Sequence, residues 1–230
     1  MDAIDELIDA AQTFYDDARA NENGRSLSWE HCFRVFRDAR TDPSPDYDYL
    51  SLHLAFYLAS WGMYRGSSFL LQKDYKVLSP VVEEVLKPEY DCLFGVACAD
   101  LREPEVQVML TKLYDYIADY FRPIRDEVAG CEVASSVSPV LVTKILMGTL
   151  GCVPAYDRFF QDGVATHKVT TQEYSLKSVL RLVDFYEEHN DRLEETRRGM
   201  QCEDLTYPQM KVLDMGFWQV GFEKDTGSAK

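Results

Sequence analysis

The spacing of apolar residues is the feature that most constrains the fold of this chain. Apolar residues recur at intervals of three and four, which is typical of a helix with one buried face. Near the N-terminus, Ile4, Leu7, Ile8, Ala11 and Phe14 follow this spacing. The apolar–polar alternation of a half-buried strand does not occur over any useful length. The sequence therefore predicts an all-α fold, a compact multi-helix globular domain.

Prolines indicate where several of these helices begin. Helices are predicted over residues 104–122, from residue 139 onward, over 172–198, and from 208 to about 222. The first, second and last of these start at a proline, which fits the first turn of a helix because no hydrogen bond is lost there.

One stretch, DYLSLHLAFYLASWGMY, is apolar nearly all round and predicts a central buried helix over about residues 49–64. The length of 230 residues fits one large domain or two small ones. We expect a single all-α domain over residues 1–225, or two helical lobes that meet near 128–138. Residues 226–230 are predicted to be a disordered tail.

Charge and motif content exclude several classes of function. The net charge of −15 argues against general nucleic-acid binding, which needs Lys and Arg to displace counterions. No uncharged apolar run reaches 18 residues, and the acidic N-terminus lacks the basic and then apolar segments of a secretory signal peptide. We therefore expect a cytoplasmic protein without a membrane span. Six scattered cysteines and four histidines show no zinc-ligand spacing, which predicts free thiols, no metal and no cofactor.

A ligand pocket is predicted where the apolar stretch ends, at SWGMYRGSS. Two glycines here would let a ligand approach the backbone, and Trp61, Tyr64, Arg65, Ser67 and Ser68 would line the site. The alternative is a helix–helix corner with a serine as N-cap. An arginine beside so apolar a helix needs a partner, either an internal carboxylate or an anionic ligand. Acidic residues outnumber basic ones by 39 to 24, which favours the internal carboxylate.

The segment VTKILMGTLGCVPAYDRFF, with the residues before it from about 135, resembles the helix-hairpin-helix DNA glycosylase superfamily. In that family an apolar helix is followed by a short turn, Val-Pro-x-Asp, and another helix. The resemblance implies catalytic roles for Lys144 and Asp157, with Asp157 assisting base excision. This chain has SSVSP in place of the family's Gly-x-Gly hairpin, two residues between Pro154 and Asp157, and its lysine about one turn later.

Two functions follow from these observations. The first is a binding protein whose pocket near Trp61–Ser68 takes a small anionic ligand or a protein partner, while Asp157 caps the helix around residues 159–160. The second is a nucleic-acid-processing enzyme with a diverged glycosylase-like helical core, in which Lys144 and Asp157 do chemistry.

Overall fold

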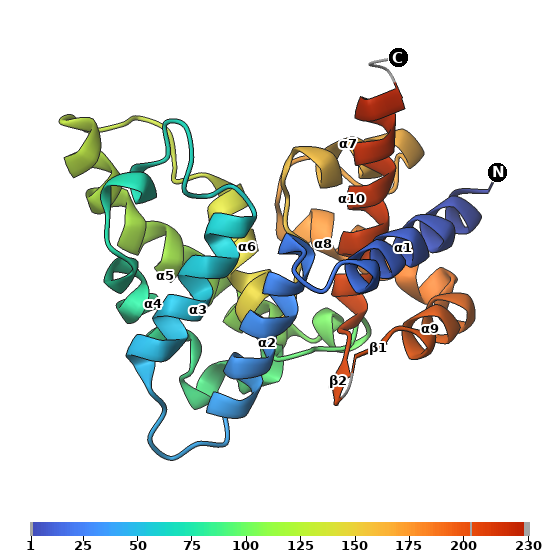
Figure 1. Ribbon diagram of the computed structural model, residues 1–230, viewed down its shortest axis with the longest axis horizontal. Coiled ribbons are helices and arrows are strands. Elements are labelled where there is room, and N and C mark those ends of the chain that lie inside the picture. Colours follow the sequence, from blue (N-terminus) through green and yellow to red (C-terminus); the bar gives the residue numbers. More distant parts are fainter. Residues whose placement is uncertain (1, 203, 228–230) are drawn as a thin grey trace.

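The computed structural model describes residues 2–202 and 204–227 and confirms the all-α fold (Figure 1). The α-helices are α1 (Ala3–Ala20), α2 (Ser28–Ala39), α3 (Tyr47–Ser60), α4 (Ser79–Val85), α5 (Pro104–Ala129), α6 (Pro139–Thr149), α7 (Arg158–His167), α8 (Leu176–Glu188), α9 (Asn190–Gly199) and α10 (Gln209–Gly227). Short 3-10 helices are η1 (Arg25–Leu27), η2 (Phe69–Gln72), η3 (Tyr75–Leu78), η4 (Pro88–Leu93) and η5 (Asp100–Arg102). Two strands, β1 (Gln201–Cys202) and β2 (Leu205–Thr206), form one antiparallel pair.

Helix starts at proline match the sequence prediction, whereas helix ends differ from it. Helix α5 continues past Pro123 to Ala129. The helix predicted over 172–198 is two helices, α8 and α9, which are separated at His189. Helix α10 runs to Gly227, so the predicted tail over 226–230 begins inside a helix, and its residues 228–230 lie outside the described residues.

The helices form two groups around one continuous apolar core (Figure 1). Helices α2 to α6 lie together, and α1 crosses to the other group, where it packs on α10 beside α7, α8 and α9. The lobe boundary is predicted near residues 128–138, which cover the end of α5 and the link to α6, and these two helices pack against each other. The N- and C-terminal helices therefore pack together, while the middle of the chain forms the remaining group.

Helix α6 is the central buried helix of this fold. All of its residues from Leu141 to Thr149 are buried, and α2, α3 and α5 surround it. The helix predicted over 49–64 is present as α3, but only one of its faces is buried. Tyr49, Leu52 and Phe56 of α3 are 50%, 51% and 60% exposed. Helix α3 therefore has apolar residues on two faces, one buried against α6 and one exposed to solvent.

Helices α7 and α10 cross with their backbones nearly in contact. A Cβ atom on Gly163 would lie 1.9 Å from the carbonyl oxygen of Phe217, and one on Gly221 would lie 2.0 Å from that of Phe159. Only glycine fits at these two positions. This close approach brings the N-terminal turn of α7 next to Trp218 of α10.

Glu194 of α9 ties the C-terminal helices together. Its carboxylate accepts hydrogen bonds from Arg197 at 2.6 Å, Gln209 at 2.6 Å and Tyr186 at 2.8 Å. Burial alone would raise the pKa of Glu194, but these donors outweigh it and hold the pKa at about 2.

Candidate functional site

The candidate site is a cavity of about 640 Å³ between the two helix groups. The C-terminal end of α3 and the loop after it form one wall. Helix α6, the start of α7 and Trp218 of α10 form the rest. Its lining residues are Arg25, Ala59, Ser60, Trp61, Gly62, Met63, Arg65, Val140, Lys144, Asp157, Arg158, Phe159 and Trp218.

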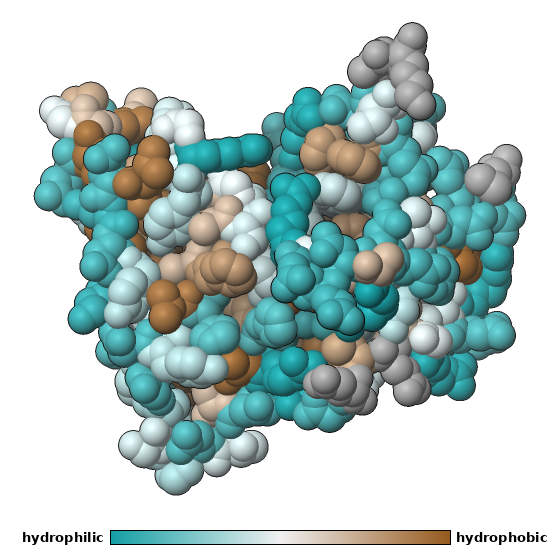
Figure 2. Space-filling view, viewed as in Figure 1, coloured by the Kyte–Doolittle hydropathy of each residue, from teal (hydrophilic) through white to brown (hydrophobic). Residues whose placement is uncertain are grey.

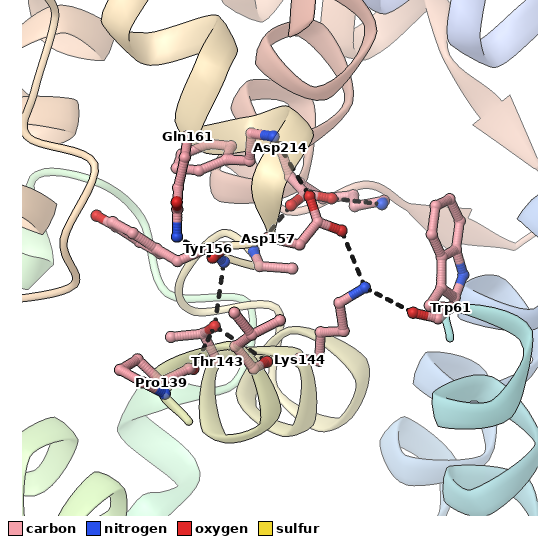
Figure 3. Close-up of polar contacts among 12 residues, drawn as sticks. Trp61, Pro139, Thr143, Lys144, Tyr156, Asp157, Gln161 and Asp214 are labelled. Carbon is pink, nitrogen blue, oxygen red and sulfur yellow. Dashed lines mark hydrogen bonds and ion pairs between the residues drawn. The ribbon is translucent and has the colours of Figure 1, made fainter. Parts of the chain in front are cut away.

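Lys144 and Asp157 form an ion pair in the wall of this cavity. The Lys144 Nζ lies 2.9 Å from Asp157 Oδ2 and donates a hydrogen bond to the carbonyl oxygen of Trp61, also at 2.9 Å (Figure 3). The Lys144 side chain is 3% exposed and that of Asp157 is 16% exposed. The Lys144 ammonium also lies 5.6 Å from the centre of the Trp61 ring. A buried ammonium needs such partners because desolvating an unpaired charge costs several kcal/mol.

Asp157 is both a helix cap and an ion-pair partner. Its Oδ1 accepts a hydrogen bond from the backbone N–H of Phe160 at 3.3 Å, which makes it the N-cap of α7. Its Oδ2 faces Lys144. The expected capping role is therefore confirmed, and it leaves the second oxygen free for Lys144.

Three hydrogen bonds fix the turn that carries Asp157. The N–H of Ala155 donates to Asp214 Oδ1 at 2.8 Å, and the N–H of Tyr156 donates to Thr143 Oγ1 at 3.1 Å. The carbonyl oxygen of Tyr156 accepts from Gln161 Nε2 at 2.7 Å (Figure 3). Because these partners come from α6, α7 and α10, the position of Asp157 depends on how those helices pack.

A second buried pair, Lys211 and Asp214, lies behind the first. The Lys211 Nζ is 2.8 Å from Asp214 Oδ2 and 4.9 Å from the centre of the Trp29 ring. Both ion pairs border a small, partly open hollow of about 10 Å³, close to the size of one water molecule. Burial, with the nearby Asp214 carboxylate, raises the pKa of Tyr57 in the same space well above its usual value.

The mouth of the cavity is cationic. Among the described residues that line it, Arg25, Arg65, Lys144 and Arg158 are cationic, and Asp157 is the one carboxylate. Arg25 lies over the Trp61 ring at 5.2 Å, and Arg158 pairs with Asp225 at 3.0 Å. A net positive lining is notable because the whole chain carries −15.

Arg65 differs from its sequence prediction. Its side chain is exposed, and it forms no ion pair or hydrogen bond with any residue in the described ranges, so the internal carboxylate partner favoured by the composition is wrong. The side chain folds back over Gly62, where a Cβ would lie 2.8 Å from Arg65 Nε. Gly62 also has a φ of 78°, a backbone conformation that residues with a side chain rarely adopt. The guanidinium is therefore held beside the cavity without a neutralising partner in the described chain.

The other predicted ligand-binding residues do not all line this cavity. Trp61 joins Arg65, Lys144 and Asp157 in the cavity. Ser67 and Ser68 line a neighbouring hollow of about 760 Å³ on the far side of Arg65, and the Ser68 hydroxyl donates to the Met63 carbonyl at 2.5 Å. Tyr64 lines neither space and packs half-buried against the core.

Arg25, Arg158 and Trp218 are among the cavity residues that were not identified from the sequence. Arg25 lies in a polar break between helices, and Trp218 lies 157 positions after Trp61 in the chain. No local pattern marks either of them. Arg158 directly follows Asp157, and its adjacency to a candidate residue is the one signal that could have drawn attention to it.

Comparison with known proteins adds no relative. No protein family, curated protein or solved structure matches this chain. None of the described helices is long and apolar enough to cross a membrane. The described residues also contain no group of three His, Cys, Asp or Glu side chains placed to hold a metal ion.

Proposed function

We propose that the cavity between α3, α6, α7 and α10 binds a small ligand through an anionic group. The observation that carries this proposal is the excess of cations in its lining, in a strongly acidic protein. Lys144 pairs with Asp157, and Arg158 pairs with Asp225. Arg25 and Arg65 have no carboxylate partner in the described chain. Folding places these cations together against their mutual repulsion, and an anion would offset that cost.

The arrangement suggests how such a ligand would be held. Arg25 and Arg65 are exposed at the mouth, where their planar guanidinium groups can each donate two hydrogen bonds to a phosphate or carboxylate. Lys144 supplies a fixed charge deeper in the wall, because Asp157 and the Trp61 carbonyl restrict its movement. The ligand would then replace water around the arginines while the Lys144–Asp157 pair stays in place.

A thermal-shift titration with inorganic phosphate and pyrophosphate tests this function. At a ligand concentration of 100 times Kd, binding stabilises a protein by about 2.7 kcal/mol. That gain would raise the Tm of a chain of this size by about 5–11 °C. We expect Arg65→Gln and Arg25→Gln to reduce the shift without lowering the Tm of the free protein. Arg181→Gln, at an exposed arginine of α8 outside the cavity, is the matched control and should keep the full shift. An absent shift in the wild type, or equal loss in all three variants, would contradict the proposal.

A second candidate, a nucleic-acid-processing enzyme, is supported by the contact between Lys144 and Asp157. These are the two residues to which the glycosylase resemblance gives catalytic roles, and their side chains lie 2.9 Å apart in the wall of an open cavity. In such an enzyme the Lys144 amine, after losing a proton to water, would attack the sugar carbon while the bond from that carbon to the base breaks and the base leaves. A carboxylate that stabilises the developing positive charge would have to lie close by. Incubation with duplex and single-stranded DNA containing damaged bases tests this candidate. Strand scission that is lost in Lys144→Ala and Asp157→Asn would favour the enzyme, and its absence with a panel of lesions would exclude those substrates.

A further inference from the structure

The solvent-facing side of α3 carries a stripe of apolar residues that no part of the described chain covers. Tyr49, Leu52 and Phe56 are each at least half exposed, and Ala59 is also exposed. Figure 2 shows apolar side chains at the surface in the region where Figure 1 places α3. Isolated apolar residues are common on protein surfaces, but a continuous row of them along one helix indicates a contact surface.

The spacing of this stripe indicates what kind of element fits it. Its members are separated by three, four and three residues, which is the repeat of the apolar positions in a helix that packs lengthwise against another helix. A helix laid along α3 would contact all four side chains at once, whereas an extended strand would not match the repeat.

We propose that the occupant is α3 of a second copy of this chain, packed antiparallel about a two-fold axis near Leu54. In this arrangement Tyr49 of one copy lies opposite Ala59 of the other, and Leu52 lies opposite Phe56. The largest member of the stripe therefore meets the smallest, so the two faces complement each other in size. A two-fold contact of this kind uses the same surface on both copies, which is the commonest form of self-association.

Charge complementarity supports the antiparallel orientation. Exposed Asp42, Asp46 and Asp48 lie around the N-terminal end of α3. Lys76 lies 3.8 Å from Asp48, and the end keeps an excess of negative charge. Arg25 and Arg65 lie beside its C-terminal end, where Ser60 and Trp61 join them in the cavity lining. An antiparallel pair brings the acidic end of each copy to the cationic end of the other. A parallel pair would place like charges together and Tyr49 against Tyr49.

Sedimentation velocity on the whole chain over about 1–100 µM tests the proposal, since an interface of one helix pair belongs to the weaker class. We expect a concentration-dependent dimer in the wild type. Phe56→Asp and Leu52→Asp should weaken association at least about tenfold, because truncating central apolar anchors removes most of the binding energy. Val108→Asp is the matched control, since Val108 is 57% exposed on α5, away from the stripe. This variant should dimerise with the same affinity as the wild type. Because these sites are solvent-exposed, circular dichroism should show the wild-type helix content in all three variants.

Disulfide trapping tests the orientation. In a background with the exposed Cys92 and Cys131 replaced by serine, we expect a mixture of Tyr49→Cys and Ala59→Cys chains to form a mixed disulfide dimer under mild oxidation. Crosslinking of Tyr49→Cys to itself with equal efficiency would overturn the antiparallel arrangement. A wild type that stays monomeric at 100 µM would overturn the self-association. A Phe56→Asp variant that dimerises normally would overturn the placement of the dimer interface on this stripe. Leu52 and Phe56 do not line the cavity. Their variants should therefore keep the rise in Tm that phosphate gives, and this measurement distinguishes failure of the dimer from failure of the ligand site.

Discussion

Replacing Asp157 by Asn isolates the charge that neutralises Lys144. Asparagine keeps a side-chain oxygen for the N–H of Phe160, so the cap of α7 should survive. The variant loses the carboxylate charge that lies 2.9 Å from Lys144 Nζ, and the Lys144 side chain is only 3% exposed. Removing one partner of a buried pair costs about 3–5 kcal/mol. Because the Asp157 side chain is 16% exposed and borders an open cavity, we expect the lower end, about 3 kcal/mol. In a chain of this size that loss lowers the Tm by about 6–12 °C.

The assay is urea unfolding followed by circular dichroism. Two further variants, Lys144→Met and the double variant, complete a double-mutant cycle. Lys144→Met combined with Asp157→Asn removes both charges, and it should recover most of the lost stability because no uncompensated charge remains buried. Asp119→Asn is the control, since it breaks the Arg122–Asp119 pair on α5, whose side chains are 54% and 64% exposed. That exposed pair should contribute less than about 1 kcal/mol.

Two results would refute this reasoning. If Asp157→Asn loses no more stability than Asp119→Asn, the Lys144 ammonium is not held as a buried charge. If the double variant is as unstable as the sum of its single variants, the two side chains are not energetically coupled. In either case Lys144 would not be the fixed charge of the ligand site.

Three further outcomes are expected. Folding depresses the pKa of Glu194 to about 2, so the stability that this carboxylate contributes is complete above its unfolded pKa and is lost as the pH falls toward 2. Between pH 5 and 2 the urea midpoint of Glu194→Gln should therefore fall less than that of the wild type. Equal falls would contradict this. Gly163→Ala should cost at least about 2 kcal/mol by forcing α7 away from α10, whereas Gly199→Ala, with no atom near its added methyl group, should be neutral or stabilising in the same melt. With a net charge of −15 we expect no tight duplex DNA binding at physiological salt in fluorescence anisotropy; salt-sensitive sub-micromolar binding that is lost in Lys144→Ala would instead favour the enzyme.

The sequence by itself determined the class of the fold and several of its local features. The spacing of apolar residues predicted helices throughout, and Pro139 and Asp157 marked the starts of α6 and α7 correctly. These signals are reliable because a helix start depends on interactions within one turn of the chain, between the cap side chain and the N–H groups that follow it. The break between α8 and α9 at His189 has no proline or glycine to mark it, and the sequence missed it.

Only the tertiary structure decided which residues share the cavity and which face of α3 is buried. Lys144 bonds to the carbonyl oxygen of a residue 83 positions away, and Trp218 reaches the cavity because α10 crosses α7. The exposure of Arg65 follows from the bend at Gly62 and not from the apolar helix before it. Hydropathy records how apolar a segment is, but burial depends on what packs against it. Those neighbours are brought together by chain folding over distances that no local pattern encodes.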